Sequence, residues 1–214
     1  MPSRPRPASS RKLILASASP RRAALLRAGG YSFRSIPSRI AERRRPAESP
    51  TAMARRLAAS KARAVASRLR PSPGGPLVLA ADTIVVIKGR VLGKPRNRRA
   101  AVRMLRLLSG KAHRVITGVA ICEVGRGKLR SACEVTWVWF RPLSGAEIES
   151  YAAGGEPLDK AGAYAIQGGA AAFVRRLRGS RSNVVGLPLE RLASMLKEAR
   201  IWSAPESRPK ASKA

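Results

Sequence analysis

Acidic residues are scarce in this 214-residue chain, which has 12 Asp and Glu against 43 Lys and Arg and a formal net charge of +31. A balance this basic predicts attraction to polyanions, whether nucleic acid, an anionic membrane or phosphorylated small molecules, and does not choose among them. A GC-rich genome would produce the same arginine bias. Because acids are so few, a carboxylate inside an apolar segment needs a specific explanation.

Cysteine, histidine and aromatic residues are also few. Cys122 and Cys133 are too few for a disulfide framework and lack the CxxC spacing of zinc or redox motifs, which favours a reducing, cytoplasmic location. His113 is the single histidine, so a histidine cluster is excluded, and its place at the start of an expected strand favours a structural role. The nine Phe, Trp and Tyr show no regular interleaving with the charges, which argues against a surface on which nucleic-acid bases stack.

Long apolar runs are absent, and none approaches the roughly 20 residues of a membrane helix. The basic start followed by Leu13 to Ala18 imitates a signal peptide, but its apolar centre is shorter than the roughly 7–15 residues that such a segment needs. We therefore expect a buried strand there and no membrane association.

Strand-like and helix-like segments alternate along the chain, which predicts one α/β domain with a mixed sheet over residues 12–202. Residues 1–11 and 203–214, rich in Pro, Ser, Lys and Arg, are predicted to be disordered basic tails. The connection 125–127, with two glycines, predicts a hairpin. The predicted strands are 12–16, 77–87, 112–124, 129–141 and 172–177, and the predicted helices are 20–28, 51–69, 98–108, 145–153 and 187–200.

The segment from Leu13 to Arg22 is a predicted strand that leads into a helix. Ser19 suits the N-cap position and Pro20 the first helical position, so free backbone N–H groups should lie beside Arg21 and Arg22. Such a helix terminus attracts phosphate, although a plain capped helix with surface arginines has the same pattern. The segment lacks GxxxxGK[ST], which excludes a P-loop.

One carboxylate, Asp82, interrupts the apolar strand 77–87. Burial of an uncompensated charge is costly, so Asp82 must form an ion pair, bind a metal or lie where the strand opens into a cleft. The later run 155–168 combines both signs of charge with glycines and a proline. This composition predicts a ligand site or an ordinary turn.

Seven short segments of the chain, including parts of the three just described, occur in an order that resembles the Maf family of nucleoside triphosphate pyrophosphatases. The family pattern includes LASxSPRRxxLL, KA, ADT, GKP, LSGxxH, GEPxDKAGxYxIQG and VVGLPL. The corresponding segments here are Leu15 to Leu26, Lys61-Ala62, Ala81 to Thr83, Gly93 to Pro95, Leu108 to His113, Gly155 to Gly168 and Val184 to Leu189. Seven matches in order make the resemblance specific.

The resemblance implies an α/β fold related to the inosine triphosphatases, with two lobes around a cleft, and hydrolysis of a nucleoside triphosphate to its monophosphate and pyrophosphate. Asp82 matches the presumed proton acceptor of the family, and Asp159 matches the Asp of its DKAG motif. The residues expected to bind substrate are Ser17, Ser19, Arg21, Arg22, Lys61, Thr83, Lys94, Lys160 and Gln167. Glu42 and Asp82 are the expected ligands of a divalent cation, Mg²⁺ or Mn²⁺.

Residues 166–168, Ile-Gln-Gly, resemble the family branch that acts on dTTP and UTP, and the branch for 7-methyl-GTP has SEG there. The amide of Gln167 can donate and accept, as the edge of a pyrimidine requires. One departure concerns the metal, because Arg39 and Ala41 replace two acids that commonly precede the Glu corresponding to Glu42.

Two other functions stay open. A basic nucleic-acid-binding protein without catalytic activity is the alternative favoured by charge alone, although we expect only weak, non-specific binding. An enzyme acting on modified nucleotides would keep the same site. The chain could work as a monomer or as a homodimer.

Overall fold

A computed structural model describes residues 11–72 and 74–198, and the two predicted tails lie outside this range except for Arg11. Arg11 forms an ion pair of 2.9 Å with Glu123 on the sheet. The domain boundaries therefore stay a prediction. No helix in the described part of the chain is both long and apolar enough to cross a membrane.

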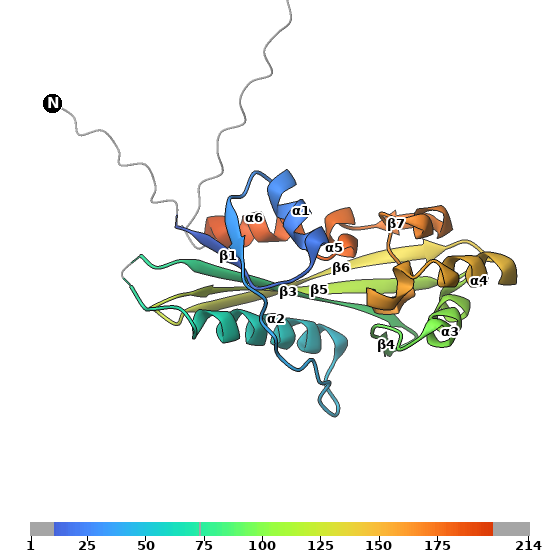
Figure 1. The fold of residues 1–214 in the computed structure, drawn as a ribbon, viewed down its shortest axis with the longest axis horizontal. Helices are drawn as coiled ribbons and strands as arrows, with labels where there is room; N and C mark the ends of the chain where they lie inside the picture. Colours follow the sequence, from blue (N-terminus) through green and yellow to red (C-terminus); the bar gives the residue numbers. More distant parts are fainter. Residues whose placement is uncertain (1–10, 73, 199–214) are drawn as a thin grey trace, which may run out of the picture.

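A mixed sheet of seven strands forms the centre of the molecule, in the order β2-β1-β3-β5-β6-β7 with β4 beside β3 (Figure 1). Strand β1 is parallel to β2 and β3, and the other pairs are antiparallel. The strands are β1 Leu13–Leu15, β2 Phe33–Ser35, β3 Leu77–Ile87, β4 Arg90–Leu92, β5 Ala112–Glu123, β6 Leu129–Phe140 and β7 Val174–Arg178. The predicted α/β fold with a mixed sheet is confirmed.

Helices cover both faces of this sheet (Figure 1). Helix α2 packs on one face, α1, α5 and α6 lie on the other, and α3 and α4 lie at the end of the sheet far from β1. The helices are α1 Pro20–Ala28, α2 Pro50–Ala66, α3 Arg98–Leu108, α4 Gly145–Ala153, α5 Arg181–Val185 and α6 Leu189–Glu198. Three 3₁₀ helices, Glu156–Asp159, Ala161–Ala163 and Gly169–Phe173, connect α4 to β7.

The apolar core is divided by the sheet and between its two ends. Leu15, Leu79 and Ile121 pack under α1 and α6, whereas Val78 and Ala120 pack against α2 on the opposite face. A separate cluster around α3 and α4 forms the second lobe. The expected arrangement of two lobes follows from these separate cores.

The predicted helices and strands are all present, and the differences from prediction lie at their ends and in short segments. The hairpin at 125–127 joins β5 and β6 as predicted. Helix α2 ends three residues before the predicted limit of 69, and residues 172–173, expected in a strand, belong to a 3₁₀ helix. Strands β2 and β4 and helix α5 were not predicted, because segments of three to five residues are too short to show a period.

Candidate active site

A large cavity opens beside β3 where this strand lacks a partner on one side. Strand β1 pairs with Leu77–Leu79 and β4 with Val85–Ile87, so within the described chain no strand flanks Asp82 and Thr83 on that side. The cavity has a volume of about 680 Å³, which is in the usual range for small-molecule sites. The backbone groups and side chains at this break in the sheet are therefore available to a ligand.

All eleven side chains predicted for the site line this one cavity. They are Ser17, Ser19, Arg21, Arg22, Glu42, Lys61, Asp82, Thr83, Lys94, Lys160 and Gln167. Together with Arg39 and Asp159, the lining holds six cationic side chains and three carboxylates. The excess of positive charge suits an anionic ligand.

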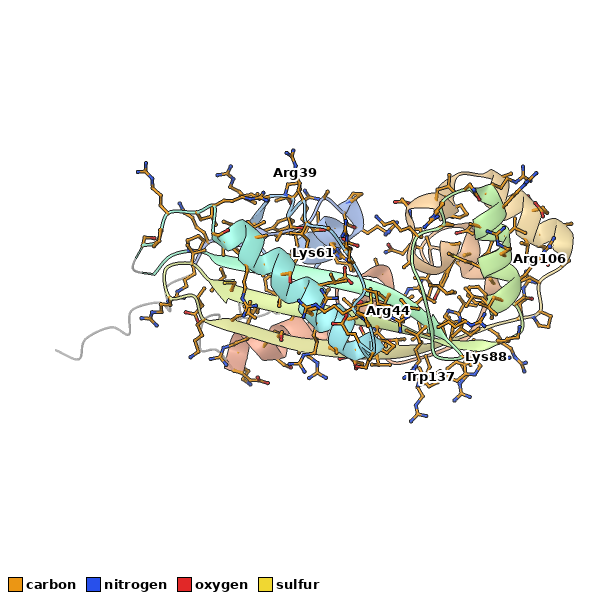
Figure 2. All side chains as sticks on the ribbon, turned by 90° about the horizontal axis from the view of Figure 1, so that it is seen from below. Arg39, Arg44, Lys61, Lys88, Arg106 and Trp137 are labelled. Carbon is orange, nitrogen blue, oxygen red and sulfur yellow. The ribbon has the colours of Figure 1, made fainter. Side chains whose placement is uncertain are left out.

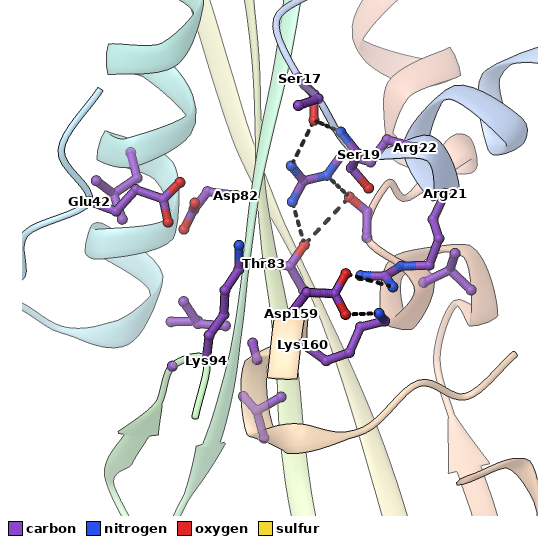
Figure 3. A pocket seen from close by; sticks show the side chains of 18 of the residues that line it. Ser17, Ser19, Arg21, Arg22, Glu42, Asp82, Thr83, Lys94, Asp159 and Lys160 are labelled. Carbon is purple, nitrogen blue, oxygen red and sulfur yellow. Dashed lines mark hydrogen bonds and ion pairs between the residues drawn. The ribbon is translucent and has the colours of Figure 1, made fainter. Parts of the chain in front are cut away.

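Successive residues of β3 project to opposite faces of the sheet, so Asp82 and Thr83 reach the two walls of the cavity separately (Figure 3). On the α2 side, Lys61 Nζ lies 2.6 Å from Asp82 Oδ1 and 2.6 Å from Glu42 Oε1. Lys61 and Asp82 are buried, whereas the Glu42 side chain is about half exposed. Asp82 thus has the ion pair that its burial requires, and it also lines the cavity.

The carboxylates on this wall keep free oxygen atoms. Asp82 Oδ2 accepts no hydrogen bond from the described residues, because Lys61 binds only Oδ1. Burial would raise the pKa of Glu42, but the hydrogen bond and charge of Lys61, with the charges of Lys94 and Arg22, bring this pKa below its usual value. Glu42 is therefore an anion at neutral pH.

On the other wall, Arg22 is fixed by three hydrogen bonds (Figure 3). Its guanidinium donates to Gly186 O at 2.8 Å, to Ser17 Oγ at 3.3 Å and to Thr83 Oγ1 at 3.2 Å. Burial lowers the pKa of Arg22, and the attraction of Asp82 and Glu42 only partly offsets this effect. An anion bound here would supply the missing compensation.

Helix α1 begins at this wall, as predicted, but its cap differs from the prediction. Ser19 occupies the N-cap position, yet its side chain accepts no capping hydrogen bond. Its backbone N–H instead donates to Ser17 Oγ at 3.1 Å. The side chain of Ser19 and the N–H groups of the first helical turn consequently remain available to a ligand.

The run 155–168 forms the third part of the lining, to which it contributes Asp159, Lys160 and Gln167. Asp159 forms an ion pair with Lys160 and lies 3.9 Å from Arg21 Nη1. Glu156 accepts a hydrogen bond from the backbone N–H of Gly169. A Cβ atom on Gly168 would lie 1.7 Å from Glu156 Oε1, so a larger residue there would require the Glu156 side chain to move. These contacts fix the backbone beside Gln167.

Sequence reasoning missed Thr117 and Asn183, which lie behind the cavity wall. Thr117 Oγ1 lies 3.0 Å from Thr83 Oγ1 and donates to Asn183 O at 3.1 Å. Asn183 Nδ2 in turn donates to Val115 O and Thr136 Oγ1. Thr117, like Asp82, is a polar residue within an apolar strand, and this pattern in the sequence could have identified it.

His113 does not line the cavity, in agreement with its expected structural role. The ring is buried, and Nε2 lies 2.8 Å from the hydroxyl of Tyr164. Burial lowers the pKa of His113 to about 4. The imidazole is therefore neutral under physiological conditions.

The donor set fits a divalent cation that is completed by substrate. No group of three or more His, Cys, Asp or Glu suitable for a metal occurs among residues 11–72 and 74–198. Glu42 and Asp82 nevertheless meet at one ammonium group, and each uses only one of its two oxygens in this ion pair. Mg²⁺ commonly binds through one or two carboxylates plus water and substrate phosphates. Positions 39 and 41 carry Arg39 and Ala41 instead of acids, but the carboxylates of Glu42 and Asp82 remain in the cavity.

Comparison with known proteins places this cavity in a family context. Residues 12–199 match the family described as Maf-like protein. A protein of Pelotomaculum thermopropionicum named dTTP/UTP pyrophosphatase is 48% identical over 188 residues, which are 88% of this chain and 96% of that protein. A protein of the same name from Geobacter sulfurreducens is 51% identical over 178 residues, which are 83% of this chain and 91% of that protein.

Among solved structures, the chain is similar to a HAM1 protein from Coxiella burnetii, with a TM-score of 0.46 and 16% identity over 88% of this chain and 99% of that chain. This similarity is too distant to bear on function.

Proposed function

Because the chain belongs to the Maf-like protein family, we propose that it is a nucleoside triphosphate pyrophosphatase that hydrolyses dTTP and UTP to the monophosphate and pyrophosphate. The observation that carries the proposal is the cavity itself, which Asp82 lines together with six cationic side chains. Relatives that are 48% and 51% identical are named dTTP/UTP pyrophosphatase. A nucleic-acid-binding role without catalysis is not favoured, because it would leave this cavity unexplained.

The cationic side chains would hold the triphosphate. Arg22 is oriented by its three hydrogen bonds and is poorly compensated by the protein, so it suits a bidentate phosphate contact. Lys94 has no hydrogen bond or ion pair within the described residues and is free to bind phosphate. Arg21 and Lys160, which share Asp159, and the first turn of α1 with Ser17 and Ser19 complete this set.

Asp82 would act on the water that attacks the substrate. In this reaction, the water oxygen forms a bond to the α phosphorus while the bond from that phosphorus to the bridging oxygen breaks. Pyrophosphate leaves with the bonding electrons, and the water proton passes to Asp82. Lys61 holds Asp82 Oδ1, which leaves Oδ2 to orient the water. Lys61 and the other cations would stabilise the charge that develops on the leaving group.

Glu42 and Asp82 would also hold a divalent cation, Mg²⁺ or Mn²⁺. When bound, this ion neutralises phosphate charge and increases the acidity of water. Lys61 positions both carboxylates by pairing with each of them. The proposal needs no further protein ligand, since substrate phosphates and water can complete the coordination.

Gln167, with Arg21 and Thr83, would select the base. The hydrogen bond from the backbone N–H of Gly169 to Glu156 holds the backbone close to Gln167, and the amide of Gln167 can match a pyrimidine carbonyl and N–H. Modified pyrimidine nucleotides fit the same description. A cytoplasmic location is part of the proposal and rests on the two free cysteines, and the mechanism applies equally to a monomer and a homodimer.

Product analysis on a panel of canonical and modified nucleoside triphosphates tests this proposal. With Mg²⁺ or Mn²⁺ present, we expect monophosphate and pyrophosphate from dTTP and UTP, and much lower rates with purine nucleotides. Release of orthophosphate and a diphosphate would place the cleavage at the other anhydride bond and refute the mechanism.

A further inference from the structure

A second cationic surface lies on the sheet, outside the cavity. Helix α2 covers β6 as far as Cys133, whose thiol donates to Thr51 O near the start of the helix. Side chains alternate along a strand, so Trp137 and Trp139 lie on the same face of the sheet as Cys133. Both tryptophans lie further along β6, beyond the N-terminal end of α2. Figure 2 shows Trp137 and Lys88 in this region. Trp137 is 41% exposed, a high value for a large apolar side chain.

Arginines flank both indole rings across the sheet. Arg114 on β5 and Arg178 on β7 lie directly opposite Trp137, and Arg176 lies opposite Trp139. The guanidinium of Arg114 is 5.7 Å from the ring centroid of Trp137, and that of Arg176 is 5.1 Å from the centroid of Trp139. We call these two tryptophans and three arginines the tryptophan face.

No carboxylate balances this charge on the same face of the neighbouring strands. The strand residues of β5, β6 and β7 that project to this side include no Asp or Glu. Glu134 of β6 projects to the opposite face, where it forms an ion pair with Arg191 of α6. The tryptophan face is therefore purely cationic and aromatic.

We propose that the tryptophan face binds single-stranded nucleic acid. The two indole rings lie 6.0 Å apart with an angle of 32° between their planes. Trp137 is exposed and Trp139 is partly buried, so bases can stack on the accessible parts of two neighbouring rings. The arginines on both sides of the rings would contact the backbone phosphates. None of these residues lines the cavity, so this surface is separate from the proposed active site.

The charge distribution favours nucleic acid over a second copy of the chain. Face-to-face docking of two copies would bring arginines against arginines, with no carboxylate among the β5, β6 and β7 residues of either face to pair with them. A single strand instead supplies a negative charge at each nucleotide and an apolar base for each ring. Binding need not depend on the sequence of the nucleic acid, because every base has an aromatic surface.

Fluorescence anisotropy with a labelled single-stranded oligonucleotide of about 15 nucleotides tests the proposal at moderate salt, where purely electrostatic binding is weakened. We expect the double variant Trp137→Ala/Trp139→Ala to bind at least about tenfold more weakly than the wild type. The double variant Trp137→Phe/Trp139→Phe keeps two aromatic rings and should stay within about threefold of the wild type.

A charge control separates the tryptophan face from the overall basic charge. Arg176→Gln/Arg178→Gln removes two exposed cations from the face, and Arg99→Gln/Arg103→Gln removes two exposed cations from α3. We expect the first pair to weaken binding several-fold more than the second. This comparison also applies if the alanine variant fails to fold.

Equal affinities for all these variants would overturn the proposal, because binding would then reflect net charge alone. A change from dimer to monomer in the alanine variant, measured by light scattering and without a change in affinity, would overturn it as well. That result would identify the face as a contact between copies.

Discussion

Lys61 balances two carboxylates at the centre of the proposed active site. Its ammonium group lies 2.6 Å from both Asp82 and Glu42, and it is almost completely buried. The ion pair with Asp82 does not exclude catalysis, since the second oxygen of Asp82 has no partner within the described chain. The structural and catalytic interpretations of Asp82 therefore require a measurement that separates them.

The variant Asp82→Asn separates these interpretations. We expect turnover of dTTP to fall by at least about 10²–10⁴-fold, because the amide cannot accept the proton of the attacking water. An unpaired buried charge costs about 3–5 kcal/mol. The free energy of unfolding should fall by less than this, since Lys61 would keep Glu42 as its partner. Steady-state kinetics and thermal unfolding of the same sample measure both effects.

Glu149→Gln is the matched control for this variant, because Glu149 pairs with Arg98 and Arg106 on the surface and does not line the cavity. This change should leave turnover unaltered. If Asp82→Asn were destabilised but turned over substrate almost normally per folded molecule, the catalytic assignment would be wrong.

The buried imidazole of His113 predicts a pH-dependent stability. Its pKa is about 4 in the native state and near 6.5 in the unfolded state, so only the unfolded chain takes up this proton in between. The free energy of unfolding should consequently decrease by about 3 kcal/mol from this group as the pH falls from 6.5 to 4. Denaturant unfolding at a series of pH values measures this decrease.

In the variant His113→Gln, an amide that does not titrate can keep the contact with Tyr164. The decrease in the free energy of unfolding between pH 6.5 and 4 should then be about 3 kcal/mol smaller than in the wild type. If the free energy of unfolding depended on pH identically in both proteins, the pKa of His113 would be the same in the native and unfolded states, which would contradict the prediction.

Individual residues differ in how well sequence could predict their roles. Asp82 was identifiable because a lone acid in an apolar strand needs a partner, although the pattern could not name Lys61 as that partner. The hydrogen bond from Arg22 to Thr83 joins residues 61 positions apart and depends on the packing of α1. The tryptophan face illustrates the same limit, since its charges and rings meet only across three strands.

At the level of elements, the break beside β3 creates the cavity. Strands β1 and β4 pair with different ends of β3 and leave its middle open next to α2. Gly118 of β5 lies opposite Asp82 and permits α2 to approach, because a Cβ atom there would lie 2.1 Å from Ala54 O. The close approach of α2 brings Lys61 to Asp82.

The variant Gly118→Ala tests this packing. The added methyl group meets helix backbone, so α2 must move away from the sheet, and we expect a loss of about 1–3 kcal/mol of stability. Turnover should also fall, because Lys61 would shift relative to Asp82. Gly145→Ala is the control, since its Cβ atom would meet nothing within 4 Å. Equal stability of both variants would argue against close packing at Gly118.

Long elements were predictable because their apolar periodicity extends over several turns or alternations. The boundaries of α1, α3, α4 and β3 agree with the predicted ranges. Strand β4, of three residues, was not predictable, although it forms one side of the break at β3. The position of the cavity therefore depends on an element that sequence periodicity does not reveal.

At the level of the whole molecule, the net charge of +31 has two separate consequences in this account. In the cavity, cations from both walls and from the run 155–168 converge on the place proposed for the triphosphate. On the tryptophan face, arginines lie beside the exposed ring of Trp137 and the partly buried ring of Trp139. Composition alone predicted affinity for polyanions but could not distinguish these two surfaces.

In the proposed reaction, water attacks the α phosphorus of a pyrimidine nucleoside triphosphate held in this cavity. Hydrolysis of dTTP in ¹⁸O-labelled water, followed by mass spectrometry of both products, tests it most directly. Attack at the α phosphorus would give one labelled oxygen in dTMP and none in the pyrophosphate. Label in the pyrophosphate, or in released orthophosphate, would contradict it.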